Sequence, residues 1–124
     1  MILGIGTDII ENERVRRAVD KPAVLEKAFS PREIEYCTKG NNIESFAARV
    51  AGKEAFFKAL GTGWIGEMKI YEVEILNDEL GKPYIVLSGD TLKVFEERGG
   101  GKIHISLSHL KEQAVAFVII EKAI

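Results

Sequence analysis

The chain has 124 residues, of which 46% are hydrophobic and 29% are charged, a composition typical of a folded globular domain rather than a disordered or fibrous protein. Seventeen basic and nineteen acidic side chains leave a formal net charge of -2, so no global positive field attracts nucleic acid or an anionic membrane. No apolar run reaches the roughly 20 residues that a membrane span requires. We therefore expect a single domain over residues 1–124 that has neither nucleic acid nor a membrane as a partner.

The chain contains one cysteine, Cys37, which excludes an internal disulfide. The basic segment and short apolar run that mark a secretory leader are not visible at its start. These features favour a reducing compartment, and we expect a soluble protein of the cytoplasm.

The first segment, residues 1–10, is an apolar run broken by Gly4 and Gly6, which predicts a buried strand that another backbone approaches closely. Residues 11–19 are charged and have helical spacing. Three basic residues recur there at intervals of three and four, which places them on one helical face. They are Arg14, Arg17 and Lys21. A basic face on a near-neutral protein suits the docking of an acidic partner.

Two further helices are predicted before the middle of the chain. The sequence Ser30-Pro31-Arg32-Glu33 has an N-cap serine, a proline at the first helical position and a glutamate at the third, which together form a capping box. It predicts a short helix that ends near residue 38. The longest helical pattern covers residues 44–60 and ends at the Gly-Thr-Gly sequence of residues 61–63.

The second half of the chain favours strands. Alternating apolar and charged residues predict strands at residues 71–75 and 84–87, joined as a hairpin. Asp90 is expected to cap a short helix, and two more strands are expected at residues 103–107 and 114–120. The order of strand, helices, hairpin, helix and hairpin predicts an α+β fold, in which an antiparallel sheet packs with one long central helix and shorter helices.

The longest predicted helix carries two separate polar stripes. Glu54 and Lys58 project from one stripe, and Arg49 and Lys53 project from the other. Apolar residues occupy much of the remaining circumference, so we expect this helix to be covered on more than one side. From spacing alone, Glu54 and Lys58 could form an ordinary surface ion pair, and Asp8 could be a helix N-cap.

Several short motifs become specific when they are taken in order. They are Gly6-x-Asp8 with Arg14 six residues later, Phe46-x-x-Arg49-x-x-x-Lys53-Glu54-Ala55-x-x-Lys58-Ala59-x-Gly61-Thr62-Gly63, Gly81-Lys82-Pro83 and Ser106-x-Ser108-His109. With these motifs the chain resembles holo-acyl-carrier-protein synthase, the small bacterial type of 4'-phosphopantetheinyl transferase, over essentially its whole length. Larger transferases usually carry a second acidic residue two positions after the first-motif aspartate, where this chain has Ile10, and in this respect the chain is similar to the small type.

The resemblance implies the 4'-phosphopantetheinyl transferase fold and transfer of the 4'-phosphopantetheine arm of coenzyme A to a serine of apo acyl carrier protein, with release of 3',5'-ADP, for fatty acid biosynthesis. It implies Mg²⁺ as the cofactor, held by Asp8 and Glu54, because carboxylate oxygens suit this ion. Lys58, one turn beyond Glu54, would contact the same phosphates. The residues expected at coenzyme A are Lys58, Gly61, Gly63, Lys82, Ser108 and His109. The basic face would dock the acyl carrier protein.

The sequence leaves the general base open. Asp8, Glu54 and His109 could each accept the proton of the attacking serine. His104 alternates with apolar neighbours like an ordinary strand side chain, whereas His109 stands where a strand ends. We therefore take His109 as the site histidine, with binding of a coenzyme A phosphate as its favoured role.

The resemblance also implies a homotrimer whose active sites are shared between subunits. The sequence adds weaker support, because the long helix and the apolar strands together carry many apolar side chains for one small domain to bury.

Two other functions stay open at this point. One is another Mg²⁺-dependent phosphoryl-transfer or phosphodiester-cleaving enzyme built on Asp8, Glu54 and Lys58. The other is a coenzyme A or nucleotide binding module without transferase activity.

Overall fold

The computed structural model describes residues 1–40, 42–63, 66 and 68–124. Its larger sheet has three antiparallel strands, in which the central strand β5 (Gln113–Lys122) pairs with both β1 (Ile2–Glu11) and β4 (Gly100–His109). A separate antiparallel hairpin consists of β2 (Val73–Asn77) and β3 (Pro83–Leu87). All five predicted strands are therefore present, and the antiparallel arrangement is confirmed.

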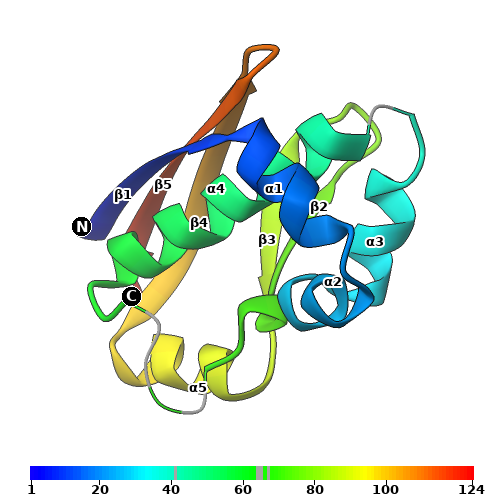
Figure 1. Ribbon diagram of the computed structural model, residues 1–124. Coiled ribbons are helices and arrows are strands. Elements are labelled where there is room, and N and C mark those ends of the chain that lie inside the picture. Colours follow the sequence, from blue (N-terminus) through cyan, green and yellow to red (C-terminus); the bar gives the residue numbers. More distant parts are fainter. Residues whose placement is uncertain (41, 64–65, 67) are drawn as a thin grey trace.

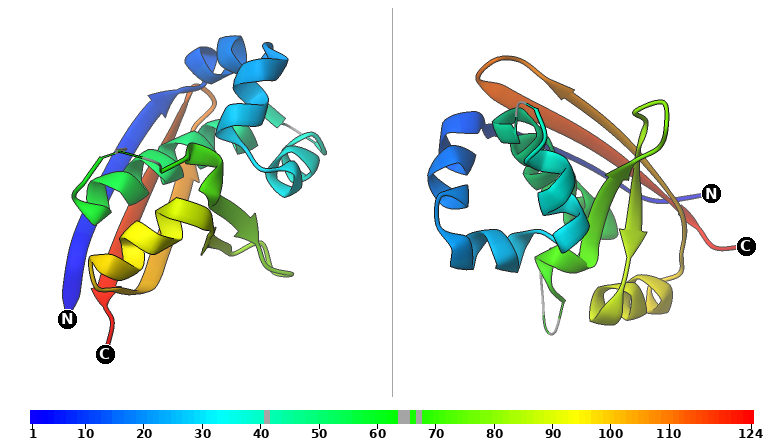
Figure 2. Two further views of the ribbon diagram at one scale, coloured as in Figure 1. Left: turned by 90° about the horizontal axis from the view of Figure 1, so that it is seen from below. Right: turned by 90° about the vertical axis from the view of Figure 1, so that its right-hand side faces the viewer.

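The long helix crosses one face of the larger sheet, and shorter helices surround it (Figure 1). The helices are α1 (Asn12–Val19), α2 (Pro22–Ala28), α3 (Pro31–Cys37), α4 (Asn42–Leu60) and α5 (Gly89–Glu97), with a 3-10 helix, η1, at Ile70–Glu72. Figure 2 shows α1 to α3 gathered at one end of the molecule and α5 well away from them. In the part of the chain that the structure describes, no helix is long and apolar enough to cross a membrane.

Helix α4 is covered on more than one side, as its sequence predicted. It packs against β1 and β5 of the larger sheet and also contacts β2, β4, α1 and α3. Small side chains make the approach of the sheet possible, because alanines of α4 are buried in the contact. They are Ala47, Ala51, Ala55 and Ala59. The polar stripe of Glu54 and Lys58 stays exposed.

Three local expectations differ from the structure. Helix α2 was not among the predicted helices; it begins at Pro22, where a proline at the first position needs no amide partner. Residues 70–72 form η1 instead of the start of a strand. Asp90 does not cap α5, because Ser88 is the N-cap residue and the buried carboxylate of Glu72 accepts hydrogen bonds from the amides of Asp90 and Thr91. A distant side chain thus replaces the local cap.

Cys37 is fully buried in α3, and burial raises the pKa of its thiol to about 11. Little thiolate is present near neutral pH, so we expect a thiol reagent to modify Cys37 only when the protein unfolds. Labelling with an aromatic disulfide reagent at pH 8, with and without denaturant, checks this expectation. Rapid labelling of the native protein would contradict it.

Candidate active site

Asp8 lies in β1, on the side of the strand that meets α4. Gly4 and Gly6 precede it at intervals of two and therefore share this side. A Cβ atom at Gly6 would lie 2.0 Å from the backbone oxygen of Ala55, and one at Gly4 would lie 1.7 Å from that of Ala59. Only glycine tolerates contacts this close, so the two glycines let the strand lie directly on the helix. The predicted close backbone approach is confirmed.

The contact between strand and helix brings Lys58 to Asp8. The Lys58 ammonium donates hydrogen bonds to Oδ1 of Asp8 at 3.0 Å and to the backbone oxygen of Thr7 at 3.1 Å. The Lys58 side chain is 56% exposed and that of Asp8 only 17%, so the pair stands at the edge of the core. Asp8 is not a helix N-cap, because it pairs with Ala116 inside the sheet and Glu11 occupies the N-cap position of α1.

The side chains of Asp8 and Glu54 are of the kind that holds a magnesium ion. Asp8 and Glu54 offer carboxylate oxygens, and Glu54 lies exposed one helical turn before Lys58. The described residues contain no group of three or more histidine, cysteine, aspartate or glutamate side chains arranged to hold a metal. Mg²⁺ needs no such group, because it keeps several waters and is commonly held by one or two carboxylates together with substrate phosphates.

His109 contacts the other end of α4. Its Nδ1 is 3.1 Å from a carboxylate oxygen of Glu44, at the first turn of α4. Both residues line a cavity of about 380 Å³ that Arg49, Gly81 and other residues complete. Ser108, the neighbour of His109 at the end of β4, is exposed. Lys82, which follows Gly81 in the turn between β2 and β3, is exposed too.

The structure therefore separates the predicted site residues into two groups. Asp8 of β1 contacts Lys58, which shares α4 with Glu54, whereas His109 contacts Glu44. Glu44 and Glu54 are ten positions apart on α4, which corresponds to roughly 15 Å along the helix axis. In the sheet, Asp8 and His109 stand on opposite edge strands, with β5 between them. A single chain does not bring His109 to Asp8.

Other predicted positions fall beside one of these groups or outside both. Gly61 and Gly63, just after α4, adopt φ angles of 84° and 63°, which favour glycine. His104, in the middle of β4, pairs with Glu121 and contacts neither group, in agreement with its interpretation as a strand side chain. The pKa of the Glu121 carboxyl is lowered by its hydrogen bond with His104.

The basic surface predicted from the sequence is present. Arg14 and Arg17 project from α1, and Lys21 occupies the N-cap position of α2, so the three come from two helices and not from one. They line a shared shallow depression together with Ala18. We call these three residues the docking surface, after the role that the sequence predicts for them. Within the described ranges, no carboxylate forms an ion pair with any of them.

Arg49 is a cavity residue that sequence reasoning did not assign to a site. It is buried, donates hydrogen bonds to the backbone oxygen of Ile75 and to Asn77, and lies 4.6 Å from the centre of the Tyr36 ring. Its position on α4, well away from Glu54 and Lys58, was predicted, but its neighbours come from α3 and β2. These segments are far apart in the sequence, and residue spacing along the chain does not show that they meet. Local sequence patterns therefore could not have identified the cavity.

Comparisons with known proteins identify the family. The profile of the 4'-phosphopantetheinyl transferase superfamily matches residues 4–118. A holo-[acyl-carrier-protein] synthase of Geotalea daltonii is 46% identical over 98% of this chain and 100% of its own length. The crystal structure of the holo-[acyl-carrier-protein] synthase from Neisseria meningitidis superposes with a TM-score of 0.90, at 34% identity, over 98% of this chain and 100% of that one.

A second solved structure adds a ligand. It is a holo-(acyl-carrier-protein) synthase from Bacillus anthracis in complex with CoA (3',5'-ADP), with a TM-score of 0.81 and 36% identity over 99% of each chain. The fold, the sequence match over nearly the whole length and the nature of the relatives agree with one another, and they confirm the resemblance inferred from the motifs. The chain therefore belongs to the holo-[acyl-carrier-protein] synthase family of 4'-phosphopantetheinyl transferases.

Proposed function

We propose that this protein transfers the 4'-phosphopantetheine moiety of coenzyme A to a serine of apo acyl carrier protein and releases 3',5'-ADP, as a step that serves fatty acid biosynthesis in the cytoplasm. The observation that carries the proposal is the contact between Lys58 and Asp8, beside Glu54, in a chain similar to holo-[acyl-carrier-protein] synthases over nearly its full length. The lone, buried Cys37 suits a reducing compartment.

In the proposed reaction, the serine oxygen forms a bond to the β-phosphorus of coenzyme A, and the bond from that phosphorus to the oxygen of 3',5'-ADP breaks. Asp8 and Glu54 would hold Mg²⁺, which neutralises charge on the pyrophosphate. Lys58 places a positive charge beside Asp8 and is exposed enough to reach a phosphate oxygen. The proton of the serine passes to Asp8, Glu54 or His109, which all stay candidates for the general base.

Mass spectrometry of an apo carrier protein incubated with the enzyme, coenzyme A and Mg²⁺ tests this function directly. One serine should gain a single phosphopantetheine arm, and an equal amount of 3',5'-ADP should appear. Release of 3',5'-ADP without a modified carrier would indicate a hydrolase instead. Binding of coenzyme A without any product would indicate a binding module.

We expect Arg14→Glu to raise the KM for the carrier protein roughly tenfold and to weaken the dependence of KM on salt, because the docking surface attracts an acidic helix. Steady-state kinetics at two ionic strengths measure both effects. Lys93→Glu is the matched control, since it makes the same change in charge on exposed α5. Equal KM values for the two variants would remove the docking assignment.

The proposed assembly is a homotrimer, and the open face of the larger sheet supports it. Helix α4 covers one face, while large apolar side chains on the other face are partly exposed. They are Ile5 at 56%, Ile9 at 62%, Val115 at 38% and Phe117 at 42% exposed. Association through this face would bury them, and a closed ring of three subunits would leave no open apolar patch. Light scattering at micromolar concentration measures the assembly, and a fully active monomer would refute it.

A shared active site explains how His109 could serve the reaction, because it stands apart from Asp8 within one chain. We expect a mixture of inactive Glu54→Gln and His109→Ala variants to recover activity after subunit exchange, since some sites then combine an intact group from each chain. A mixture of Glu54→Gln with Asp8→Asn is the control and should recover none. If the first mixture stays inactive while native mass spectrometry confirms exchange, the sites are not shared in this way.

A further inference from the structure

A buried ion pair joins α3 to α4 outside the two groups of site residues. The Lys53 ammonium lies 2.7 Å from Oε1 of Glu33, and the two side chains are only 2% and 0% exposed. The ammonium also donates hydrogen bonds to the backbone oxygens of Ala28, at 2.8 Å, and Ile70, at 3.3 Å. Oε2 of Glu33 accepts the amide of Ile75 at 3.0 Å. One ion pair therefore connects α4 with α2, α3, η1 and β2.

The pair stands at the corner where α2 ends and α3 begins. Lys53 places its charge at Ala28, the last residue of α2, and Glu33 accepts the amide of Ser30 at the start of α3. A cation at the end of one helix and an anion at the start of the next are both favourable positions. Helix α2 has no fully buried residue of its own, so the contacts at its ends matter for its position.

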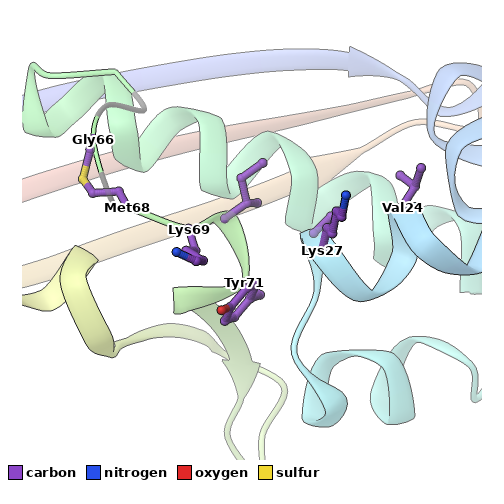
Figure 3. Close-up of a pocket in the computed structure, with 8 residues that line it drawn as sticks. Val24, Lys27, Gly66, Met68, Lys69 and Tyr71 are labelled. Atoms are coloured by element: carbon purple, nitrogen blue, oxygen red, sulfur yellow. The ribbon is translucent and has the colours of Figure 1, made fainter.

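A cavity beside the ion pair separates α2 from the segment that includes η1. Figure 3 shows Val24 and Lys27 of α2 on one side of a cavity and Met68 and Tyr71 on the other side. The cavity has a volume of about 500 Å³, and Ala28 and Ile70 line it as well. Because the side chains of the described residues leave this space open, their apolar packing alone does not fix the separation of α2 from η1 here. The two hydrogen bonds of Lys53 connect the two walls.

Stability alone is a weak reason for such a pair. Burial lowers the pKa of the Lys53 ammonium, which means that its surroundings oppose the charge even though Glu33 favours it. Buried ion pairs can often be replaced by neutral side chains of similar size without loss of stability, whereas they do impose one geometry. The geometry imposed here relates α2, which begins beside Lys21 of the docking surface, to the turn of α4 that carries Glu54.

We infer that Lys53 and Glu33 are positioning residues for the transfer reaction, which hold the docking surface in a defined place relative to Glu54 and Lys58. The inference rests on the proposed function. Both side chains are buried, so they act through the position of α2 and not as catalytic residues. Loss of the pair should therefore impair use of the carrier protein, whose serine must reach the phosphorus while the carrier is docked, and leave coenzyme A binding unchanged.

The decisive variant is the double substitution Glu33→Gln with Lys53→Met, which removes both charges at similar side-chain volume. The contact between Phe29 and Phe46 is kept, with ring centres 4.9 Å apart, and helps to hold the corner folded. We expect an unfolding midpoint close to that of the wild type, a carrier KM raised roughly tenfold or more, and a coenzyme A KM within about twofold of wild type. The single variant Lys53→Met should be less stable than the double variant, because it leaves Glu33 charged, buried and unpaired.

Arg32→Gln is the matched control. Arg32 pairs with Glu74 and so also joins α3 to β2, but at the surface and without contact to α2. It should leave the carrier KM unchanged. If the double variant does not fold, Glu33→Asp replaces it, because this substitution keeps the charge and shortens the side chain by one methylene. We expect the same selective rise in the KM for the carrier protein. Amide hydrogen exchange in α2 should also become faster.

Two results would overturn the positioning role. One is a carrier KM equal to that of the wild type in the folded double variant or in Glu33→Asp. The other is an equal rise in both KM values, which would mean that the pair merely supports the whole fold. A wild-type enzyme that modifies no carrier protein would refute the proposed function itself, and the positioning role with it, so the two failures are distinguishable.

Discussion

Replacing Asp8 with asparagine or Glu54 with glutamine should lower kcat/KM for transfer by at least about a hundredfold, equivalent to about 2.7 kcal/mol of transition-state stabilisation. Each substitution removes one negative charge from a set that provides only two carboxylates for a magnesium ion, and the chain offers no third in their place among its described residues. Both variants should fold, because Glu54 is exposed and the Asp8 side chain contacts the exposed Lys58.

Calorimetric titration of Mg²⁺ in the presence of coenzyme A provides a measurement independent of turnover. Weakened Mg²⁺ binding in both variants, with an unfolding midpoint near that of the wild type, would support the assignment. Glu97→Gln, which removes an exposed carboxylate at the end of α5, is the control and should change neither quantity. Wild-type turnover at limiting Mg²⁺ in either site variant would show that the carboxylates do not hold the metal.

Gly6→Ala should destabilise the protein by about 3 kcal/mol and lower its Tm by roughly 10 °C. The added methyl group would lie 2.0 Å from the backbone oxygen of Ala55 and 2.6 Å from the backbone nitrogen of Ala59, and backbone atoms of a packed helix cannot rotate away. β1 would have to move off α4. Because that movement also separates Asp8 from Lys58, transfer activity should fall even at temperatures where the variant is folded.

Gly52→Ala distinguishes this explanation from a general intolerance of larger residues. A methyl group at Gly52 would meet only the ends of side chains, with Cδ1 of Ile75 nearest at 2.5 Å, and alanine favours the helix that contains it. We expect its effect on the free energy of unfolding to be within about 1 kcal/mol. Thermal unfolding of both variants measures the difference. If Gly6→Ala were as stable as Gly52→Ala, the close contact of β1 with α4 would not be a constraint on the fold.

Local signals predicted most secondary structure because each depends on residues that are close in the sequence. The capping box at Ser30 and Glu33 forms as expected, with both hydrogen bonds present. The prediction that Asp90 caps α5 was wrong because this cap depends on a residue that is distant in the sequence. The cap comes from Glu72, which lies 18 residues earlier, and no local pattern connects the two positions.

By itself the sequence determined the order of the five strands and of the helices other than α2 and η1, the two polar stripes of the long helix and the family, since periodicity and motif spacing are properties of the chain alone. Only the tertiary structure decided which partners the polar side chains meet. Lys58 pairs with Asp8 of β1, 50 residues away, and not with Glu54 on its own helix. The packing of β1 on α4 sets that choice, because Gly4 and Gly6 bring the strand onto the helix. In the same way, the burial of Lys53 against Glu33 and the separation of His109 from Asp8 follow from how the sheet and helices pack, which the spacing of residues along the chain does not specify.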